Sequence, residues 1–505
     1  MIEEGGAVAE RTWFDVVIVG GGPAGAVLAN RLTAEAGRSV LLVEAGPDYG
    51  SNVADWPADL LFSQQQPLTS HSWGLYDAGN GNFLPRARLL GGASAVNACY
   101  WIRGSASDYD QWEALGNPGW TFDDLLPYFR RAESDPLGGP LHGADGPVQV
   151  LRAEIWSPGD TAFAEAAASH GLAKIADING DREQVPSVGP VPKNIVAGNR
   201  FNAALSYLAP VRERPNLTIR TETLVDRVRF AGERAIGIVT SSGEEIDAGL
   251  VALAAGAYFT PGILNRSGYG NYEDLRLLGI PVRQHLPGVG KNLLDHPFSI
   301  DVLAGVLASE AECGKQLQGQ AMARSRSRGS SEEIDCHIYN SQNYDADLRR
   351  WVIGLSVSLV NARSTGSVSL ASTDPTELPR VEHRHYSDAG DLERMCDGIE
   401  LALEIFSSQP LTEIVEPLED RLWRWSDRQS LGALVLERSQ TTNHCSGTAK
   451  MGPSSDPLAV VDVAGRIYGA ENLVVADSSI FPMCPRGNIH FPVVAVAEKV
   501  AAGLT

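Results

Sequence analysis

The sequence predicts an α/β protein built from two closely joined domains. Its 505 residues exceed what a single compact core usually holds. Residues 14–20 and 39–44 are short apolar runs typical of buried parallel strands, and 24–36 between them has the spacing of a helix. A strand and a helix are again expected at 473–476 and 492–503. We therefore expect both ends of the chain to form one domain, with the other domain inserted between them.

A glycine-rich turn joins the first predicted strand to its helix. Gly20, Gly22 and Gly25 form a G-x-G-x-x-G pattern, and Glu44 ends the next predicted strand. The glycines let backbone N–H groups approach a pyrophosphate at the N-terminus of the helix. A carboxylate at the position of Glu44 can accept hydrogen bonds from a ribose hydroxyl. These features predict a Rossmann-like dinucleotide site, but they do not separate NAD from FAD.

The centre of the chain has weaker patterns. Residues 71–120 are rich in Gly, Trp, Tyr and Asn and are expected to form loops around a ligand. Residues 301–345 are poorly patterned, and we expect 324–331 (RSRSRGSS) to be a mobile loop. Short β-like pieces occur from 355 to 385, and 390–406 has the pattern of an amphipathic helix. Further strands are expected at 217–228, 235–239 and 250–256.

Composition and charge exclude several classes of partner. A formal net charge of −21 argues against nucleic acid and anionic membranes, which both require clustered Lys and Arg. No apolar run approaches the roughly 18–20 residues of a membrane span. The acidic start of the chain, residues 1–5, leaves no room for a signal peptide before the first strand. We therefore expect a cytoplasmic protein without a membrane span.

The cysteines predict neither disulfides nor a metal site. They stand at positions 99, 313, 336, 396, 445 and 484, with no C-x-x-C pair and no spacing typical of metal ligands. This scatter suits a reducing compartment. Cys445 is interpreted as a packing residue, because nothing near it in sequence except His444 would lower its pKa.

Motifs along nearly the whole chain resemble the signature of the glucose–methanol–choline (GMC) oxidoreductase family, in the form of its bacterial members with a His/Asn active site. They include Arg88–Asn97 (RLLGGASAVN), Gly116–Trp120 (GNPGW), Gly288–Leu293 (GVGKNL), Asp295–Pro297 (DHP), His444–Thr448 (HCSGT) and Ala476–Pro482 (ADSSIFP). The resemblance implies a Rossmann-like FAD-binding domain, with a substrate domain built on an antiparallel sheet. It also implies an FAD-dependent alcohol oxidase or dehydrogenase.

The resemblance implies two catalytic residues. His444 matches the histidine that takes the hydroxyl proton of the alcohol, and Asn488 matches the partner that hydrogen-bonds the substrate oxygen. His490 follows two residues later, and a role in the flavin cradle is favoured over a direct catalytic one. A helix beginning near Phe491 would aim its positive end at the flavin.

Val96 departs from part of the family. Some choline-oxidising relatives carry a histidine here that is covalently bonded to the flavin, and valine has no nucleophile, so we expect FAD to be bound without a covalent link. The residues expected to bind it are Gly20, Gly22, Pro23, Ala24, Gly25, Glu44, Ala45, Arg88, Gly91, Gly92, Asn97, Val225, Ala255, Asp477, His490 and Phe491.

The expected domains alternate along the chain. The FAD-binding domain takes 1–155, 197–298 and 437–505, and the last of these parts carries His444 and Asn488. The substrate side takes an insertion at 156–196 and a larger domain at 299–436.

The leading hypothesis is oxidation of a primary alcohol to the aldehyde by hydride transfer to flavin N5, with oxygen or another electron acceptor. The substrate would be aromatic or heteroaromatic, such as pyridoxine. Two alternatives stay open: an enzyme like the hydroxynitrile lyases, which keep FAD without net redox chemistry, and a dehydrogenase that passes electrons to a quinone or a redox partner. The sequence leaves the oligomeric state open.

Overall fold

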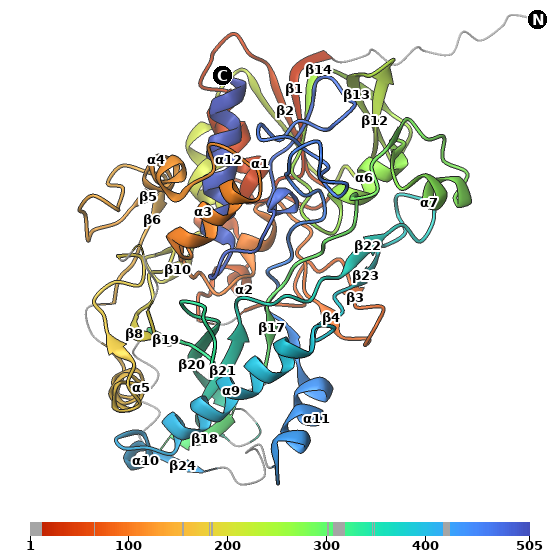
Figure 1. Ribbon diagram of the computed structural model, residues 1–505. Coiled ribbons are helices and arrows are strands. Elements are labelled where there is room, and N and C mark those ends of the chain that lie inside the picture. Colours follow the sequence, from red (N-terminus) through yellow and green to blue (C-terminus); the bar gives the residue numbers. More distant parts are fainter. Residues whose placement is uncertain are drawn as a thin grey trace, which may run out of the picture.

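Two β-sheets organise the molecule, one in the upper and one in the lower half of Figure 1. The structure is a computed structural model. It describes residues 13–64, 66–153, 156–180, 182, 185–299, 302–306, 319–345, 347, 349–417 and 425–505.

The first sheet combines a parallel part with an antiparallel meander. Five strands are parallel, in the spatial order β11 (Leu217–Arg220), β2 (Val40–Val43), β1 (Trp13–Val19), β14 (Glu245–Leu253) and β26 (Leu473–Val475). The meander runs from β12 (Val225–Ala231) through β13 (Arg234–Thr240) into the first part of β14. Each β2 residue is buried, as expected for a strand covered on both faces.

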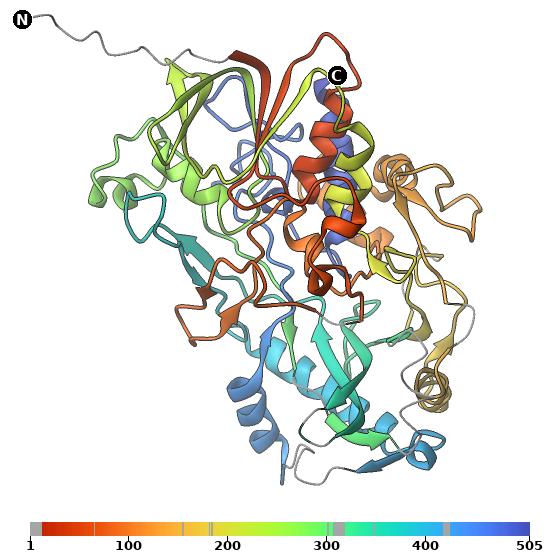
Figure 2. The same cartoon turned by 180° about the vertical axis from the view of Figure 1, so that it is seen from behind.

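Two helices from opposite ends of the chain cover the first sheet. Helix α1 (Pro23–Leu32) packs along α12 (His490–Leu504), side by side in Figures 1 and 2. Pro23 occupies the first turn of α1, where its missing N–H costs nothing. Gly25 lets this helix approach the strand before it, because a Cβ there would lie 1.9 Å from the carbonyl oxygen of Gly20. The last helix of the chain therefore packs on the first and completes the helical layer beside this sheet.

The second sheet is mostly antiparallel and carries its helices on one face. Its strands are β24 (Val415–Pro417), β18 (Val302–Val306), β21 (Arg350–Leu359), β20 (Cys336–Asp345), β19 (Ala321–Ser325), β8 (Ser187–Pro190) and β7 (Ala173–Lys174), with β17 (Pro297–Phe298) and β25 (Gln440–Thr441) beside β21. Helix α9 (Ala389–Phe406) packs against β20 and β21, and α5 (Pro158–Ser169) and α11 (Arg428–Arg438) flank it. A separate hydrophobic core lies between this sheet and these helices.

Shorter elements connect the two halves. The remaining α-helices are α2 (Ala58–Leu61), α3 (Ala106–Ala114), α4 (Phe122–Ala132), α6 (Thr260–Arg266), α7 (Tyr272–Leu277) and α10 (Leu411–Ile414). Short strand pairs are formed by β3 (Leu75–Tyr76) with β4 (Phe83–Leu84), β5 (Glu133–Ser134) with β6 (Val148–Gln149), β9 (Ile195–Val196) with β10 (Asn199–Arg200), β15 (Tyr269–Gly270) with β16 (Gln284–His285), and β22 (Ser367–Ser369) with β23 (Arg380–Glu382). Single 3₁₀ turns occur at Val53–Asp55, Gly92–Ala95, Ala209–Val211 and Ser478–Ile480, and Ala204–Leu208 forms one wider turn of π-helix. None of the helices in the described ranges combines the length and the apolar character needed to cross a bilayer.

The α/β fold class predicted from the sequence is confirmed, and two local expectations are wrong for part of their range. Arg324 and Ser325 belong to β19 and not to a mobile loop. Arg324 is fully buried because its Nε donates to Ser187 Oγ and its Nη1 to the carbonyl of Ile178. The segment 71–120 is also not all loop, since it contains α3. The N-terminal residues 1–5 and Cys313 lie outside the described residues.

The division into domains remains our proposal. Strands of the second sheet come from both 156–196 and 299–436, which supports assigning these two segments to one domain.

Candidate active site

A cavity of about 720 Å³ lies between the two sheets. One end is lined from the carboxyl ends of β1, β2 and β14, where α/β sheets hold their ligands. The other end is lined by residues of β20 and β21, among them Tyr339 and Ser356. The cavity therefore joins a potential nucleotide cradle to a separate compartment for a small molecule.

The glycine loop forms the nucleotide end. Gly20, Gly22, Pro23 and Ala24 all line the cavity. A Cβ at Gly92 would come within 2.8 Å of the Gly22 Cα, so two backbones meet here without side chains between them. Such bare backbone at the N-terminus of a helix suits a pyrophosphate, and the cradle fits FAD.

Glu44 stands beside this cradle. Its Oε2 accepts a hydrogen bond from the Gly21 N–H at 2.8 Å, and its Oε1 accepts one from the Gly46 N–H at 2.9 Å. Burial raises the pKa of Glu44, and these two amides oppose that shift. Each carboxylate oxygen keeps a second lone pair that a ribose hydroxyl can use.

Most of the other residues expected to bind the cofactor also line the cavity. These are Ala45, Gly92, Asn97, Val225, Ala255, Asp477 and His490. The Asp477 carboxylate is itself bound to protein, since its Oδ2 accepts from the Gly256 N–H at 2.8 Å and from Thr260 Oγ1 at 2.7 Å. These contacts hold the loop after β14 in place.

Four of the expected residues do not line the cavity. Gly25 mediates the contact of α1 with β1, and Gly91 adopts a positive φ of 99° behind the lining. The Arg88 guanidinium lies 5.0 Å from the centre of the Trp73 ring, and its Nε donates to the carbonyl of Ala45. Phe491 is buried and stacks on Trp101 at 4.1 Å.

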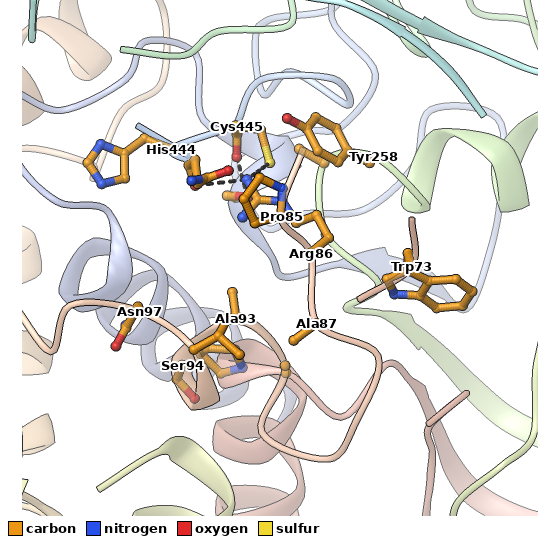
Figure 3. Close-up of a pocket in the computed structure, with 18 of the residues that line it drawn as sticks. Trp73, Pro85, Arg86, Ala87, Ala93, Ser94, Asn97, Tyr258, His444 and Cys445 are labelled. Atoms are coloured by element: carbon orange, nitrogen blue, oxygen red, sulfur yellow. Dashed lines mark hydrogen bonds between the residues drawn. The ribbon is translucent and has the colours of Figure 1, made fainter. Parts of the chain in front are cut away.

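His444 and Asn488 meet in the cavity wall. The Asn488 Nδ2 lies 3.2 Å from the His444 Nε2, and the His444 Nδ1 lies 2.9 Å from the Nδ1 of His296. Because the amide N–H is a donor, the hydrogen-bond network assigns the acceptor role to Nε2 and the proton to Nδ1 of His444. The basic nitrogen of His444 therefore faces Asn488, and His296 holds the other side of the ring. Figure 3 shows His444 among the lining residues together with Asn97 and Ser94.

Burial keeps His444 and His490 neutral. The pKa of His444 falls to about 3, chiefly by burial and then by the neighbouring His296, and Asp295 opposes this shift. Burial alone lowers the pKa of His490 to about 4. The His490 Nδ1 lies 3.3 Å from the Asn97 amide, which ties the start of α12 to the loop that carries Val96. His444 is thus in the neutral form that a base requires, and the same burial makes its protonated form costly.

The sequence interpretation missed Arg86. Its guanidinium donates to the carbonyl of Asn443 at 2.8 Å and to the Sγ of Cys445 at 2.7 Å, and it lies over the Tyr258 ring (Figure 3). It thereby holds the Asn443 backbone and the Cys445 side chain, which lie on either side of His444 in the chain. The only sequence signal was its position two residues before the conspicuous motif at Arg88. Burial raises the pKa of the Cys445 thiol, in keeping with a packing role.

A buried chain of acids and histidines also stands behind His444. The Asp295 Oδ1 accepts from the His444 backbone N–H at 2.8 Å, and its Oδ2 lies 3.1 Å from the Nε2 of His385. His383 lies between Asp295 and Asp77, 2.7 Å from the latter. Asp295, His383 and His385 are close enough to share a metal ion, as are Glu133, Asp135 and His142. The second group is already compensated by arginines, because Arg103 and Arg152 pair with its carboxylates.

A Rossmann-like cradle that opens onto a neutral histidine and an amide defines a dinucleotide-dependent oxidoreductase. Comparison with known proteins then gives the family. The model of GMC oxidoreductases matches residues 14–298 with its N-terminal part and 362–497 with its C-terminal part. The chain belongs to the GMC oxidoreductase family, and the expected FAD cofactor and alcohol oxidase or dehydrogenase class are confirmed.

Three relatives illustrate the similarity. The mitochondrial choline dehydrogenase of Mus musculus is 35% identical, over 97% of this chain and 89% of its own. The 5-(hydroxymethyl)furfural oxidase of Methylovorus sp. (strain MP688) is 36% identical, over 97% of this chain and 98% of its own. The crystal structure of pyridoxine 4-oxidase from Mesorbium loti superposes with a TM-score of 0.87 at 30% identity and covers 97% and 99% of the two chains.

Proposed function

We propose that this enzyme oxidises a primary aromatic or heteroaromatic alcohol, such as pyridoxine, to the aldehyde, with His444 as the base. The observation that carries the proposal is the pairing of His444 Nε2 with Asn488 Nδ2 at 3.2 Å in the wall of the cavity. Two of the relatives described above are named for the oxidation of heteroaromatic alcohols, which supports this substrate class.

His444 and Asn488 divide the work on the hydroxyl group. A hydroxyl placed between them donates its hydrogen bond to Nε2 of His444 and accepts one from the amide of Asn488. His444 then removes the proton, and Asp295 next to its backbone offsets part of the cost of the new buried charge. Bound FAD supplies the hydride acceptor at N5. The start of α12 contributes its positive end to the same region.

Replacing the base tests this division. His444→Ala should lower the rate of flavin reduction about 10²- to 10⁴-fold, the usual contribution of a positioned base, with FAD still bound. Asn488→Ala should lose less, about 10²-fold, as expected for one lost transition-state hydrogen bond. Stopped-flow measurement of flavin bleaching under anaerobic conditions gives both rates. His285→Ala, at an exposed histidine on β16, is the control. A His444→Ala rate close to that of the wild type would exclude the base assignment.

We also propose that FAD is held without a covalent bond. Val96 lines the cavity, and its side chain has no nucleophile. Acid precipitation should therefore leave the yellow colour in the supernatant, as measured by flavin absorbance of both fractions. Colour that stays in the pellet would contradict this proposal.

Two assays identify the electron acceptor and test the lyase alternative. Hydrogen peroxide formed in air during alcohol turnover identifies an oxidase, whereas turnover only with an added quinone or dye identifies a dehydrogenase. Product formation from a cyanohydrin with the flavin still yellow would identify the lyase alternative. We propose a cytoplasmic location, supported by the free thiols of all five cysteines within the described residues.

A further inference from the structure

Asn488 stands in a loop. Residues 481–489 connect the turn at Ser478–Ile480 with α12 and belong to no helix or strand. The amide of Asn488 must nevertheless meet the His444 Nε2 at 3.2 Å. Because no regular element fixes this stretch of chain, its position depends on the contacts that the loop makes with its surroundings.

Two glycines let this loop lie directly on the segment before α3. A Cβ at Gly487 would lie 3.1 Å from the backbone nitrogen of Gly104 and 3.1 Å from the Cγ2 of Ile102. Gly104 adopts a φ of 88°, and a Cβ there would lie 3.0 Å from Asp108 Oδ2 and 3.1 Å from the Cβ of Pro485. The two backbones thus meet without side chains between them, and the carboxylate of Asp108 stands at this contact.

The Asp108 carboxylate bonds both segments. Its Oδ2 accepts from the Arg486 N–H and from the Ser105 N–H, each at 2.8 Å. The bond to Ser105 belongs to the capping box at the start of α3. The other oxygen, Oδ1, lies 3.5 Å from the Nε of Arg486, and neither of these two atoms forms a hydrogen bond within the described residues. Asp108 is fully buried, so water screens this ion pair little.

Arg486 connects the same loop to the other half of the molecule. Its Nη1 donates to Ser107 Oγ at 3.1 Å, and its Nη2 donates to Glu332 Oε2 at 2.9 Å. Glu332 lies between β19 and β20 of the second sheet. A guanidinium two residues before Asn488 therefore ties the loop to α3 on one side and to the second sheet on the other.

We propose that Asp108 and Arg486 are positioning residues, and that their ion pair holds the Asn488 amide where it can bind the substrate oxygen. Neither residue lines the cavity, so both act through Asn488. The inference rests on the proposed function, because that function assigns the substrate oxygen to Asn488.

The charge of this pair responds to pH. Burial raises the pKa of Asp108 to about 6, and Arg486 and the two backbone N–H groups oppose this shift. Glu333 also faces Asp108 and raises its pKa further. Tyr109 and Cys484 are uncharged neighbours, because burial raises the pKa of each well above its ordinary value. Below pH 6 Asp108 is protonated, and its attraction to Arg486 is lost.

The pH profile of flavin reduction tests the pair in the wild-type enzyme. The limiting rate constant under anaerobic conditions should fall about 10-fold between pH 8 and pH 5, less than the 10²-fold that a misplacement of about 1 Å can cost. Protonation of His444 does not cause this fall, because the pKa of His444 is about 3. A rate constant that stays level through pH 6 would overturn the proposal.

Asp108→Asn mimics the protonated carboxyl. It should show the low rate already at pH 8 and no pH dependence between 8 and 5. Asp124→Asn is the matched control, because Asp124 takes the same place in the capping box of α4 and bonds Thr121 there. The control should keep the wild-type rate and profile. A wild-type profile in Asp108→Asn would overturn the proposal.

Substitution of the arginine tests the other partner. Arg486→Met should lower the rate constant at pH 8 about as much as Asp108→Asn does. Arg486→Lys keeps the positive charge but not all the hydrogen bonds, and should restore part of the rate. Equal rates in the Met and Lys variants would assign Arg486 a packing role and overturn the proposal.

A crystal structure of Asp108→Asn with FAD bound separates this inference from the proposed function. The Asn488 amide should lie beyond hydrogen-bond distance of the His444 Nε2, with the flavin in place. An unchanged distance of 3.2 Å would overturn the inference even if alcohols reduce the flavin. A displaced amide in an enzyme whose flavin no alcohol reduces would support the inference and defeat the proposed oxidation.

Discussion

At the scale of single residues, the site depends on histidines that are buried without charge. The pKa values of His296 and His490 are lowered to about 4 and that of His444 to about 3, in each case mainly by burial, and His337 is lowered well below its ordinary value by the same cause. These residues stay neutral in the folded protein at a pH at which the unfolded chain protonates them. The unfolded state thus binds more protons as the pH falls below about 6.5, which destabilises the fold.

This linkage predicts the acid sensitivity of the enzyme. Between pH 6.5 and 5 the free energy of unfolding should fall, with a limiting slope of roughly 1.4 kcal/mol per pH unit for each such histidine. Burial lowers the pKa of His142, but hydrogen bonds to its carboxylate partners outweigh this effect and raise the pKa to about 10. His142 therefore stabilises the fold below pH 6.5 and loses that effect only as the pH rises toward 10. It therefore adds little to the slope in this window. Chemical denaturation at several pH values measures the slope.

A substitution tests whether the buried histidines cause this pH dependence of the free energy of unfolding. His490→Gln should flatten the pH dependence between pH 6.5 and 5, because it removes one group that titrates only in the unfolded state. His285→Gln, at the exposed histidine, removes a group without such burial and should leave the slope as in the wild type. The interpretation fails if both variants keep the wild-type slope.

At the scale of elements, the turn between β1 and α1 has the strictest geometry. Gly20 adopts a φ of 104°, and a Cβ at Gly25 would lie 1.9 Å from its carbonyl oxygen. That contact is with backbone, so a side chain cannot move aside, and the helix must shift away from the strand. The position of the cradle therefore depends on a hydrogen atom at Gly25.

Gly25→Ala should consequently weaken FAD binding and stability together. Overpacking in a tight core costs about 1–3 kcal/mol or more, and the displaced helix also moves its N–H groups away from the pyrophosphate. Flavin content after purification and thermal unfolding measure the two effects. Gly37→Ala is the matched control, because a Cβ there meets nothing within 4 Å. Full flavin content in Gly25→Ala would refute the geometric argument.

The elements also show what sequence can and cannot reveal. The βαβ unit at the N-terminus and the strand and helix at the C-terminus were predicted because their signals are local: apolar runs, glycines and a carboxylate at fixed spacing. The loop expected at 324–331 was wrong for Arg324 and Ser325, because a run of Arg and Ser is typical of solvent-exposed chain. Partners that are distant in sequence, among them Ser187 and Ile178, make burial of Arg324 possible.

The support around His444 was invisible for the same reason. Asp77, Asp295 and His383 belong to three segments, and Arg86, on the same β3–β4 hairpin as Asp77, reaches Asn443 and Cys445. The spacing of residues within one segment cannot predict a network whose members come from several segments. Motif resemblance supplied His444 and Asn488, whereas their environment, and with it the neutral state of His444, required the folded structure.

At the scale of the whole molecule, the two sheets contribute different parts of one cavity. The first sheet provides the backbone cradle at its carboxyl edge, and the second provides the compartment for a small molecule at the other end. His444 and Asn488 stand at the junction, in the last segment of the chain. Changes in the second sheet can therefore alter the substrate while the cofactor contacts stay as they are.

The pairing of α1 with α12 and of β14 with β26 has a consequence for biosynthesis. A nascent chain exposes the glycine loop early, but the strand and helix that cover it, 473–475 and 490–504, emerge only with the last segment. Until then α1 can pack against β1, β2 and the turn at Ala204–Leu208, but it lacks its main partner, α12. We therefore expect the flavin to bind tightly only after α12 has been synthesised and has packed on α1.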